Sequence, residues 1–126
     1  MRGVIISGAI LLVIVALMSV SWVAIEKAGE NMCARIDIIK EDVRLEKWEK
    51  AEKHTEDLQK QWEKDVRWIT MLVDHRETDE IAKEIYALEE YIEYREVPEL
   101  MATASSLREL FEHIPRKERP SLENII

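Results

Sequence analysis

The feature that most constrains the fold is a run of 22 uncharged residues near the amino terminus, Val4–Ile25. As an α-helix this run would be about 33 Å long, which is enough to cross the hydrocarbon core of a bilayer. Trp22 lies near its end, where aromatic rings favour the membrane interface. A cleaved signal peptide is the alternative, but its apolar stretch would be shorter, and Ser19–Ser21 is only a weak cleavage site. We therefore predict an uncleaved transmembrane anchor over residues 1–25.

The charges on either side of this run predict the orientation of the anchor. The short amino-terminal side carries Arg2 and the α-amino group, whereas the other side begins with Glu26, Lys27 and Glu30. Positive charge close to the membrane favours the cytoplasmic side. We therefore expect a single-pass protein of the cell membrane with a cytoplasmic amino terminus and an extracytoplasmic domain over residues 26–126.

The domain beyond the anchor is strongly acidic. The chain has a net charge of -8, and Arg2 is its only charged side chain before Glu26, so residues 26–126 carry 17 Lys and Arg against 26 Asp and Glu, or -9. Nucleic-acid binding needs a basic surface, so no nucleic-acid partner is expected. The single cysteine, Cys33, excludes an intrachain disulfide and a multi-cysteine zinc cluster, and we expect it to be a small packed side chain.

The spacing of apolar residues beyond the anchor is helical throughout. Steps of three and four recur in the stripe Ile25, Gly29, Met32, Ile36, Ile39 and Val43, which is typical of a helix that packs against another helix. With only three glycines and three prolines, a turn-rich β fold is excluded. The prediction is an all-α fold, in which the transmembrane helix precedes an antiparallel bundle of about four helices and a short carboxy-terminal helix. The predicted ranges are 26–43, 46–72, 78–95, 97–114 and 121–126.

Local signals set the predicted helix ends. Pro98 fits the first turn of a helix, because its missing N–H has no partner there in any case. Pro115 is expected to end the fourth helix of the bundle, and Ser121 to cap the last one. Thr78 or Asp79 is the expected cap of the third.

The bundle has the pattern of two similar helical hairpins. A shift of 49 residues places Ile36 on Ile85, and the turn at 43–48 on the turn at 92–97. Two copies of one hairpin would give this agreement of hydrophobic phase. Any two amphipathic hairpins could also align this well, so both interpretations stay open.

The lengths of the first two helices of the bundle predict a bend. A straight helix from Glu26 to Val43 would rise about 27 Å from the membrane, whereas an unbroken second helix over 45–73 would be about 43 Å long and would strike the bilayer. Either the junction at 28–30 or the second helix must bend. Gly29 is the weakest helix former of the first helix, so we expect a hinge there.

The acidic residues and histidines near two helix ends could form a metal site. In an up-and-down bundle, the turn between the second and third helices lies beside the end of the fourth. His75, Glu77, Asp79, Glu112 and His113 could therefore converge and bind zinc or a similar divalent ion. The opposing interpretation is that these residues cap helices and face solvent, because the sequence has no HExxH or paired ExxH pattern.

The aromatic residues of the domain favour packing over ligand binding. Their helical spacing predicts core or groove positions for Trp48, Trp62, Trp68, Tyr86, Tyr91 and Tyr94. Trp68 is an exception, because the stripe uses Val66 and Ile69, and it could face a partner or lipid headgroups. His54 follows Lys53 on a charged face and is expected to be solvated. The sequence shows no nucleophile–base pair, no glycine-rich phosphate loop and no redox pair, so we expect no enzyme and no cofactor.

Several motifs together resemble a known family. They are Trp48-Glu49-Lys50-Ala51, Trp62, the turn centred on His75, His113-Ile114-Pro115 and Ser121-Leu122-Glu123-Asn124-Ile125. With the apolar run, they resemble short single-pass membrane proteins of clostridial-type Gram-positive bacteria, the family catalogued as domain of unknown function 4363. The resemblance covers almost the whole chain. It implies an all-helical extracytoplasmic domain and an association with other membrane proteins, and it carries no catalytic residues.

These observations lead to two expectations for function. The first is a non-enzymatic, membrane-anchored interaction or accessory module, held in the bilayer by residues 4–25 and bound to another membrane protein or to itself. The alternative is an acidic sensor domain that binds a cation or a small ligand at the end of the bundle that carries His75 and His113.

Overall fold

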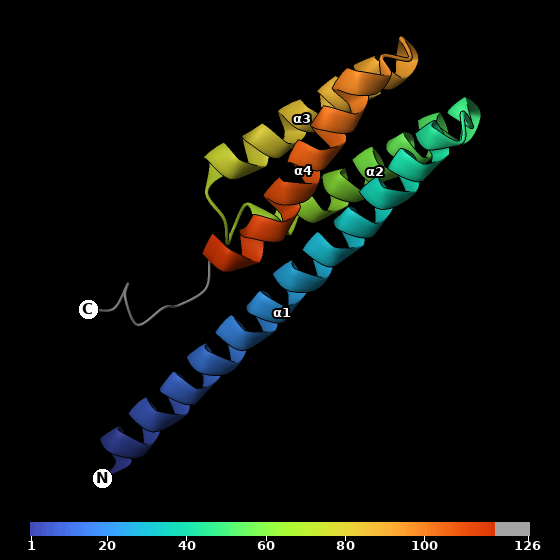
Figure 1. Cartoon of the computed structure of the whole chain (residues 1–126). Coiled ribbons are helices and arrows are strands. Elements are labelled where there is room, and N and C mark those ends of the chain that lie inside the picture. Colours follow the sequence, from blue (N-terminus) through green and yellow to red (C-terminus); the bar gives the residue numbers. More distant parts are fainter. Residues whose placement is uncertain (118–126) are drawn as a thin grey trace.

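The computed structural model describes residues 1–117, and within them the chain is entirely helical (Figure 1). The helices are α1 (Arg2–Arg44), α2 (Trp48–Ile69), α3 (His75–Glu93) and α4 (Val97–Lys117). They pack as a bundle, which confirms the all-α prediction. The predicted last helix at 121–126 and its cap Ser121 lie outside the described residues.

The predicted anchor and the first helix of the bundle form one continuous helix, α1, of 43 residues. Its amino-terminal half extends beyond the other helices (Figure 1). An 18-residue window of α1 has a mean hydropathy of 2.7, and none of it is buried in the protein. The length and composition of this segment suit a membrane span, and a signal sequence can have the same length and composition.

The carboxy-terminal half of α1 forms one corner of the bundle. It packs against α2 and α4, and α3 also packs against α2 and α4, so that α1 and α3 lie diagonally opposite. The stripe predicted from the sequence is buried without exception from Ile25 to Val43. The core is completed by the buried residues of the other helices, which include Leu58, Trp62, Ile81, Ile85, Leu88, Ile92, Leu100, Leu107, Phe111 and Ile114.

The turns α1–α2 and α3–α4 have the same backbone structure. Glu46 (φ 57°) and Arg95 (φ 52°) adopt the left-handed conformation, and they are 49 residues apart. The N–H of residue 47 donates to the carbonyl of Asp42 at 2.8 Å, and the N–H of residue 96 donates to that of Tyr91 at 2.9 Å. The other hydrogen bonds of the first turn also recur 49 residues later. Of the two interpretations of the sequence repeat, the structure supports two copies of one hairpin.

The buried residues follow the same shift. Residues at Met32, Ile36, Ile39 and Val43 are buried in the first hairpin, as are their counterparts at Ile81, Ile85, Leu88 and Ile92. The counterparts Trp62 and Phe111 meet edge to face, with ring centroids 5.7 Å apart and planes inclined at 66°. Equivalent side chains of the two hairpins thus meet in the core of the bundle.

The predicted hinge at Gly29 is wrong, because α1 continues through this residue without a break. Gly29 is instead buried against α4: a Cβ atom at this position would lie 2.9 Å from the carbonyl oxygen of Phe111. The glycine therefore permits close helix packing. The second helix is shorter than the range 45–73 used for the predicted clash with the bilayer, since α2 begins at Trp48 and ends at Ile69.

Two other predicted helix boundaries are also corrected. α3 begins at His75, three residues earlier than predicted, because Asp74 is its N-cap and accepts a hydrogen bond from the N–H of Arg76 at 3.1 Å. The predicted cap Thr78 is buried within the helix. α4 begins at Val97, so Pro98 lies in its first turn as predicted, but the helix passes Pro115 and ends at Lys117.

Candidate functional site

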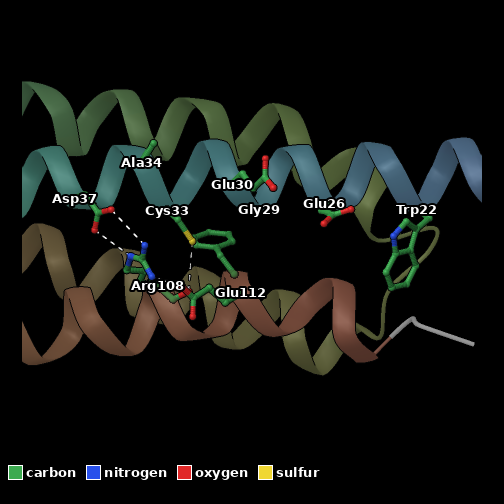
Figure 2. Close-up of a pocket in the computed structure, with 10 residues that line it drawn as sticks. Trp22, Glu26, Gly29, Glu30, Cys33, Ala34, Asp37, Arg108 and Glu112 are labelled. Carbon is green, nitrogen blue, oxygen red and sulfur yellow. Dashed lines mark hydrogen bonds and ion pairs between the residues drawn. The ribbon is translucent and has the colours of Figure 1, made fainter. Parts of the chain in front are cut away.

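A groove lies between α1 and α4, beside the junction with the apolar segment (Figure 2). It has a volume of about 570 Å³. The residues that line it are Trp22, Glu26, Gly29, Glu30, Cys33, Ala34, Asp37, Arg108, Phe111 and Glu112. Four carboxylates face one guanidinium, so the groove has an excess of negative charge.

Arg108 on α4 organises the charges at one end of the groove. Its Nε donates to Asp37 Oδ1 at 3.0 Å and its Nη2 to Asp37 Oδ2 at 3.4 Å, so the guanidinium holds one carboxylate with two hydrogen bonds. It also pairs with Glu112, one turn further along α4. The hydrogen bond with Asp37, together with both carboxylates, raises the pKa of Arg108. This network crosses from α1 to α4 and links the two walls of the groove.

Gly29 and Cys33 form the base of the groove. The absence of a side chain at Gly29 lets the carbonyl of Phe111 approach α1 closely. The thiol of Cys33 donates to the carbonyl of Arg108, with a sulfur–oxygen distance of 3.6 Å. Burial raises the pKa of Cys33 to about 11, so the group stays a neutral thiol at physiological pH and is a poor nucleophile. The prediction of a small packed side chain at Cys33 is confirmed.

A second, smaller groove lies between α2 and α3 and is the counterpart of the first. Its volume is about 250 Å³, and it is lined by Gln59, Trp62, Glu63, Val66, Thr70, His75, Thr78, Asp79, Ala82, Ile85 and Tyr86. Eight of these residues stand 49 positions from a lining residue of the α1–α4 groove: Gln59, Trp62, Glu63, His75, Thr78, Asp79, Ala82 and Tyr86. The duplicated hairpin has therefore produced two related grooves.

The side chains of the two grooves differ at the charged positions. His75 stands where the first groove has Glu26, Gln59 stands where it has Arg108, and Thr78 replaces Gly29. The second groove thus lacks the cross-helix guanidinium, and the site of close backbone approach has acquired a side chain. The two grooves present different chemistry on one scaffold.

Acidic residues of α2 and α3 lie close to one another beside the second groove, of which Glu63 is a lining residue. Burial raises the pKa of Glu89 on α3, and the carboxylates of Glu63 and Glu56 on α2 and of Glu90 on α3 raise it further. Like charges across a helix contact oppose close packing. These carboxylates therefore oppose the packing of α3 on α2.

The five predicted metal ligands do not come together. His75 and Asp79 line the α2–α3 groove, Glu112 lines the α1–α4 groove, and His113 pairs with Glu109 one turn away at 3.3 Å. Glu77 is in the first turn of α3. Within residues 1–117, no group of three His, Cys, Asp or Glu side chains has the geometry to hold a metal ion. The cation-sensor interpretation therefore stays a hypothesis without a ligand cluster to support it.

Several contacts were not anticipated from the sequence. His54, expected to be solvated, meets the buried carboxylate of Asp42, with Nδ1 2.5 Å from Oδ2. Tyr86 and Tyr94, expected to pack, are 60% and 68% exposed. Trp68 packs partly against the core. Glu26, Gly29 and Glu30 of the first groove could have been found from the 49-residue shift, because they are the counterparts of His75, Thr78 and Asp79 at the start of α3.

The fold defines the class of the protein: a four-helix bundle of two similar hairpins whose first helix has a long apolar extension at its amino terminus. Residues 20–125 match the model of the family described as Domain of unknown function (DUF4363), and the chain belongs to this family. The resemblance seen in the sequence motifs is thereby confirmed. No curated protein and no solved structure has significant similarity to the chain.

Proposed function

We propose that the protein is a single-pass membrane protein whose helical bundle stands directly on the outer surface of the cell membrane. The exposed apolar side chains of residues 4–20 support a position in lipid. Arg2 before this segment and Glu26 after it support a cytoplasmic amino terminus and an extracytoplasmic bundle.

Within this arrangement, the bundle acts as a non-enzymatic accessory module that binds another membrane protein or a second copy of the chain. The continuity of α1 carries this proposal. Since span and bundle share one unbroken helix, a partner that contacts α1 within the bilayer also fixes the orientation of the bundle. Such coupling suits a scaffold that positions one membrane protein beside another.

The end of the bundle farthest from the apolar segment supplies a second contact surface. Leu45, Tyr94 and Val97 are 54%, 68% and 40% exposed at the two equivalent turns. The guanidinium of Arg95 lies 5.4 Å from the ring centre of Trp48, which joins the two turns. This end is about 27 Å from Glu26 along α1, beyond the reach of the lipid, so a protein partner is the better match for these side chains.

The orientation is tested by labelling intact cells. In a Cys33→Ala background, a Leu45→Cys substitution places an exposed thiol on the bundle. A maleimide that cannot cross the membrane is expected to label position 45 in intact cells. Labelling only after the cells are opened would contradict the proposed orientation.

The interaction is tested by photo-crosslinking in native membranes. A photoreactive amino acid replaces Tyr94 at the distal end or, as a control, exposed Glu80 on the side of α3. A discrete adduct from position 94 only, either with a second copy or with another membrane protein, is the expected result. Equal products from both positions, or none from position 94, would contradict a specific docking surface there.

A further inference from the structure

A second contact with the membrane is suggested by the turn between α2 and α3. This turn consists of residues 70–73 and lies at the end of the bundle from which the apolar half of α1 extends (Figure 1). Met71 is 83% exposed and Leu72 is 38% exposed, whereas the adjoining Ile69 and Val73 are buried in the core. The turn therefore holds two apolar side chains outward from a fixed base.

The lengths of the helices place this turn at the membrane boundary. α2 has 22 residues and is about 33 Å long. Since α2 starts beside Arg44 and runs antiparallel to α1, and its last residue Ile69 is 21 positions after Trp48, its end lies level with the residue 21 positions back from Arg44 along α1, which is Val23. Val23 lies inside the uncharged run that ends at Ile25. The turn is thus level with the last part of the apolar segment.

The contact of α4 with α1 gives the same level independently. The carbonyl of Phe111 lies against Gly29, so these two residues are at one height. α4 continues for six residues beyond Phe111 to Lys117, and six residues back from Gly29 is again Val23. The end of α4 and the α2–α3 turn therefore form one base of the bundle at the height of the membrane interface.

The backbone of the turn is suited to a water-poor environment. The N–H groups of all four of its residues are bonded internally: those of residues 70 and 71 donate to Val66 and Trp68, and those of residues 72 and 73 donate to Ile69. Unpaired N–H groups would oppose entry into the interface. No charged residue occurs from Trp68 to Val73, and the exposed Arg67 and Arg76 on either side can meet lipid phosphates.

We propose that the α2–α3 turn is a second membrane contact, in which Met71 and Leu72 enter the interfacial region of the bilayer that α1 spans. This inference rests on the proposed function, because it requires α1 to be inserted. Two contacts, one through the span and one through the turn, would fix the rotation of the bundle about α1. They would thereby determine which face of the bundle a neighbouring membrane protein meets.

The test measures how deeply labelled positions lie in the bilayer. Single cysteines replace Met71, Leu45 or Leu12 in the full chain with Cys33→Ala, an exchange matched by the natural alanine at the counterpart position, Ala82. Each cysteine carries the same environment-sensitive fluorophore. The proteins are placed in phosphatidylcholine–phosphatidylglycerol vesicles with or without lipids that bear a spin label near the headgroup.

The three positions separate the outcomes. Quenching at position 71 is expected to exceed that at position 45 several-fold, with blue-shifted emission, because position 45 is an exposed apolar site at the opposite end. Equal quenching at 71 and 45, with position 12 shielded in lipid, would overturn the second contact but leave the anchor intact. An aqueous emission spectrum at position 12 would overturn the proposed membrane insertion and the inference with it.

Discussion

The close approach of α1 and α4 at Gly29 predicts that a single methyl group will destabilise the bundle. In a Gly29→Ala variant, the new Cβ would lie 2.9 Å from the carbonyl oxygen of Phe111. This is about half an ångström less than an ordinary contact, and the oxygen belongs to a helix backbone that cannot rotate away. α4 as a whole must therefore shift from α1.

The expected change in the free energy of unfolding is the sum of two opposing contributions. Overpacking of this kind costs about 1–3 kcal/mol, whereas replacing glycine by alanine within a helix contributes about 1 kcal/mol in the opposite direction. The expected net loss is ~1 kcal/mol, or ~4 °C in Tm for a domain of this size. In a Gly29→Val variant the larger side chain raises the steric cost and reduces the gain in helix propensity, so its loss is expected to reach ~3 kcal/mol.

The assay is thermal unfolding of the full chain in a fixed detergent, followed by circular dichroism. Gly8→Ala is the matched control, because a Cβ at Gly8 would meet no atom within 4 Å, and its Tm is expected to stay at or above that of the parent. A Gly29→Ala variant that is as stable as the parent would refute the reasoning, because helix propensity would then outweigh the close approach.

Three further predictions concern the charges and the core. Glu89→Gln is expected to raise stability at pH 7 by up to ~0.5 kcal/mol after allowance for solvent exposure. Because the pKa of Glu89 is raised in the folded state, protonation of Glu89 favours folding, and the stability gained by the substitution should vanish below about pH 4. Urea unfolding at pH 7 and below pH 4 measures this difference. A stability gain that is larger in acid than at pH 7 would contradict it. Arg108→Gln, which introduces the residue found at the counterpart position, should lower the Tm slightly at low salt and hardly at all at high salt, because its partner Asp37 is half exposed and salt screens the pair. A loss that persists at high salt in the same assay would contradict a surface ion pair. Phe111→Ala should cost ~3–5 kcal/mol through the cavity it leaves beside Trp62, and a fall in Tm of only a few degrees would contradict its central place in the core.

The parts of the fold that follow from periodic burial could be predicted from the sequence. The stripe from Ile25 to Val43 is buried as predicted, because one face of each helix must leave water. The 49-residue shift left two similar hairpins as one of two interpretations, and the left-handed residues Glu46 and Arg95 support it in the turns. Repeated hydrophobic phase is visible in sequence because each copy must bury the same face.

Features that depend on contacts between distant helices could not be predicted. Glycine lowers helix propensity, so Gly29 indicated a hinge, whereas its role is set by Phe111 on another helix. Arg108 and Asp37 are 71 residues apart, and only the packing of α4 on α1 brings them together. His75 lines the α2–α3 groove, whereas His113 pairs with Glu109 on α4; sharing one end of a bundle does not by itself place two side chains on the same face.

The most direct test of the account is a distance measurement along α1 across the junction between span and bundle. Spin labels at Leu12→Cys and Glu41→Cys, in a Cys33→Ala background, are separated by 29 residues, or about 44 Å in an unbroken helix. Double electron–electron resonance spectroscopy on the full chain in lipid nanodiscs is expected to give a narrow distance distribution centred at about this value. A broad or clearly shorter distribution would show a joint between span and bundle, and would contradict the claim that one continuous helix holds the bundle on the membrane.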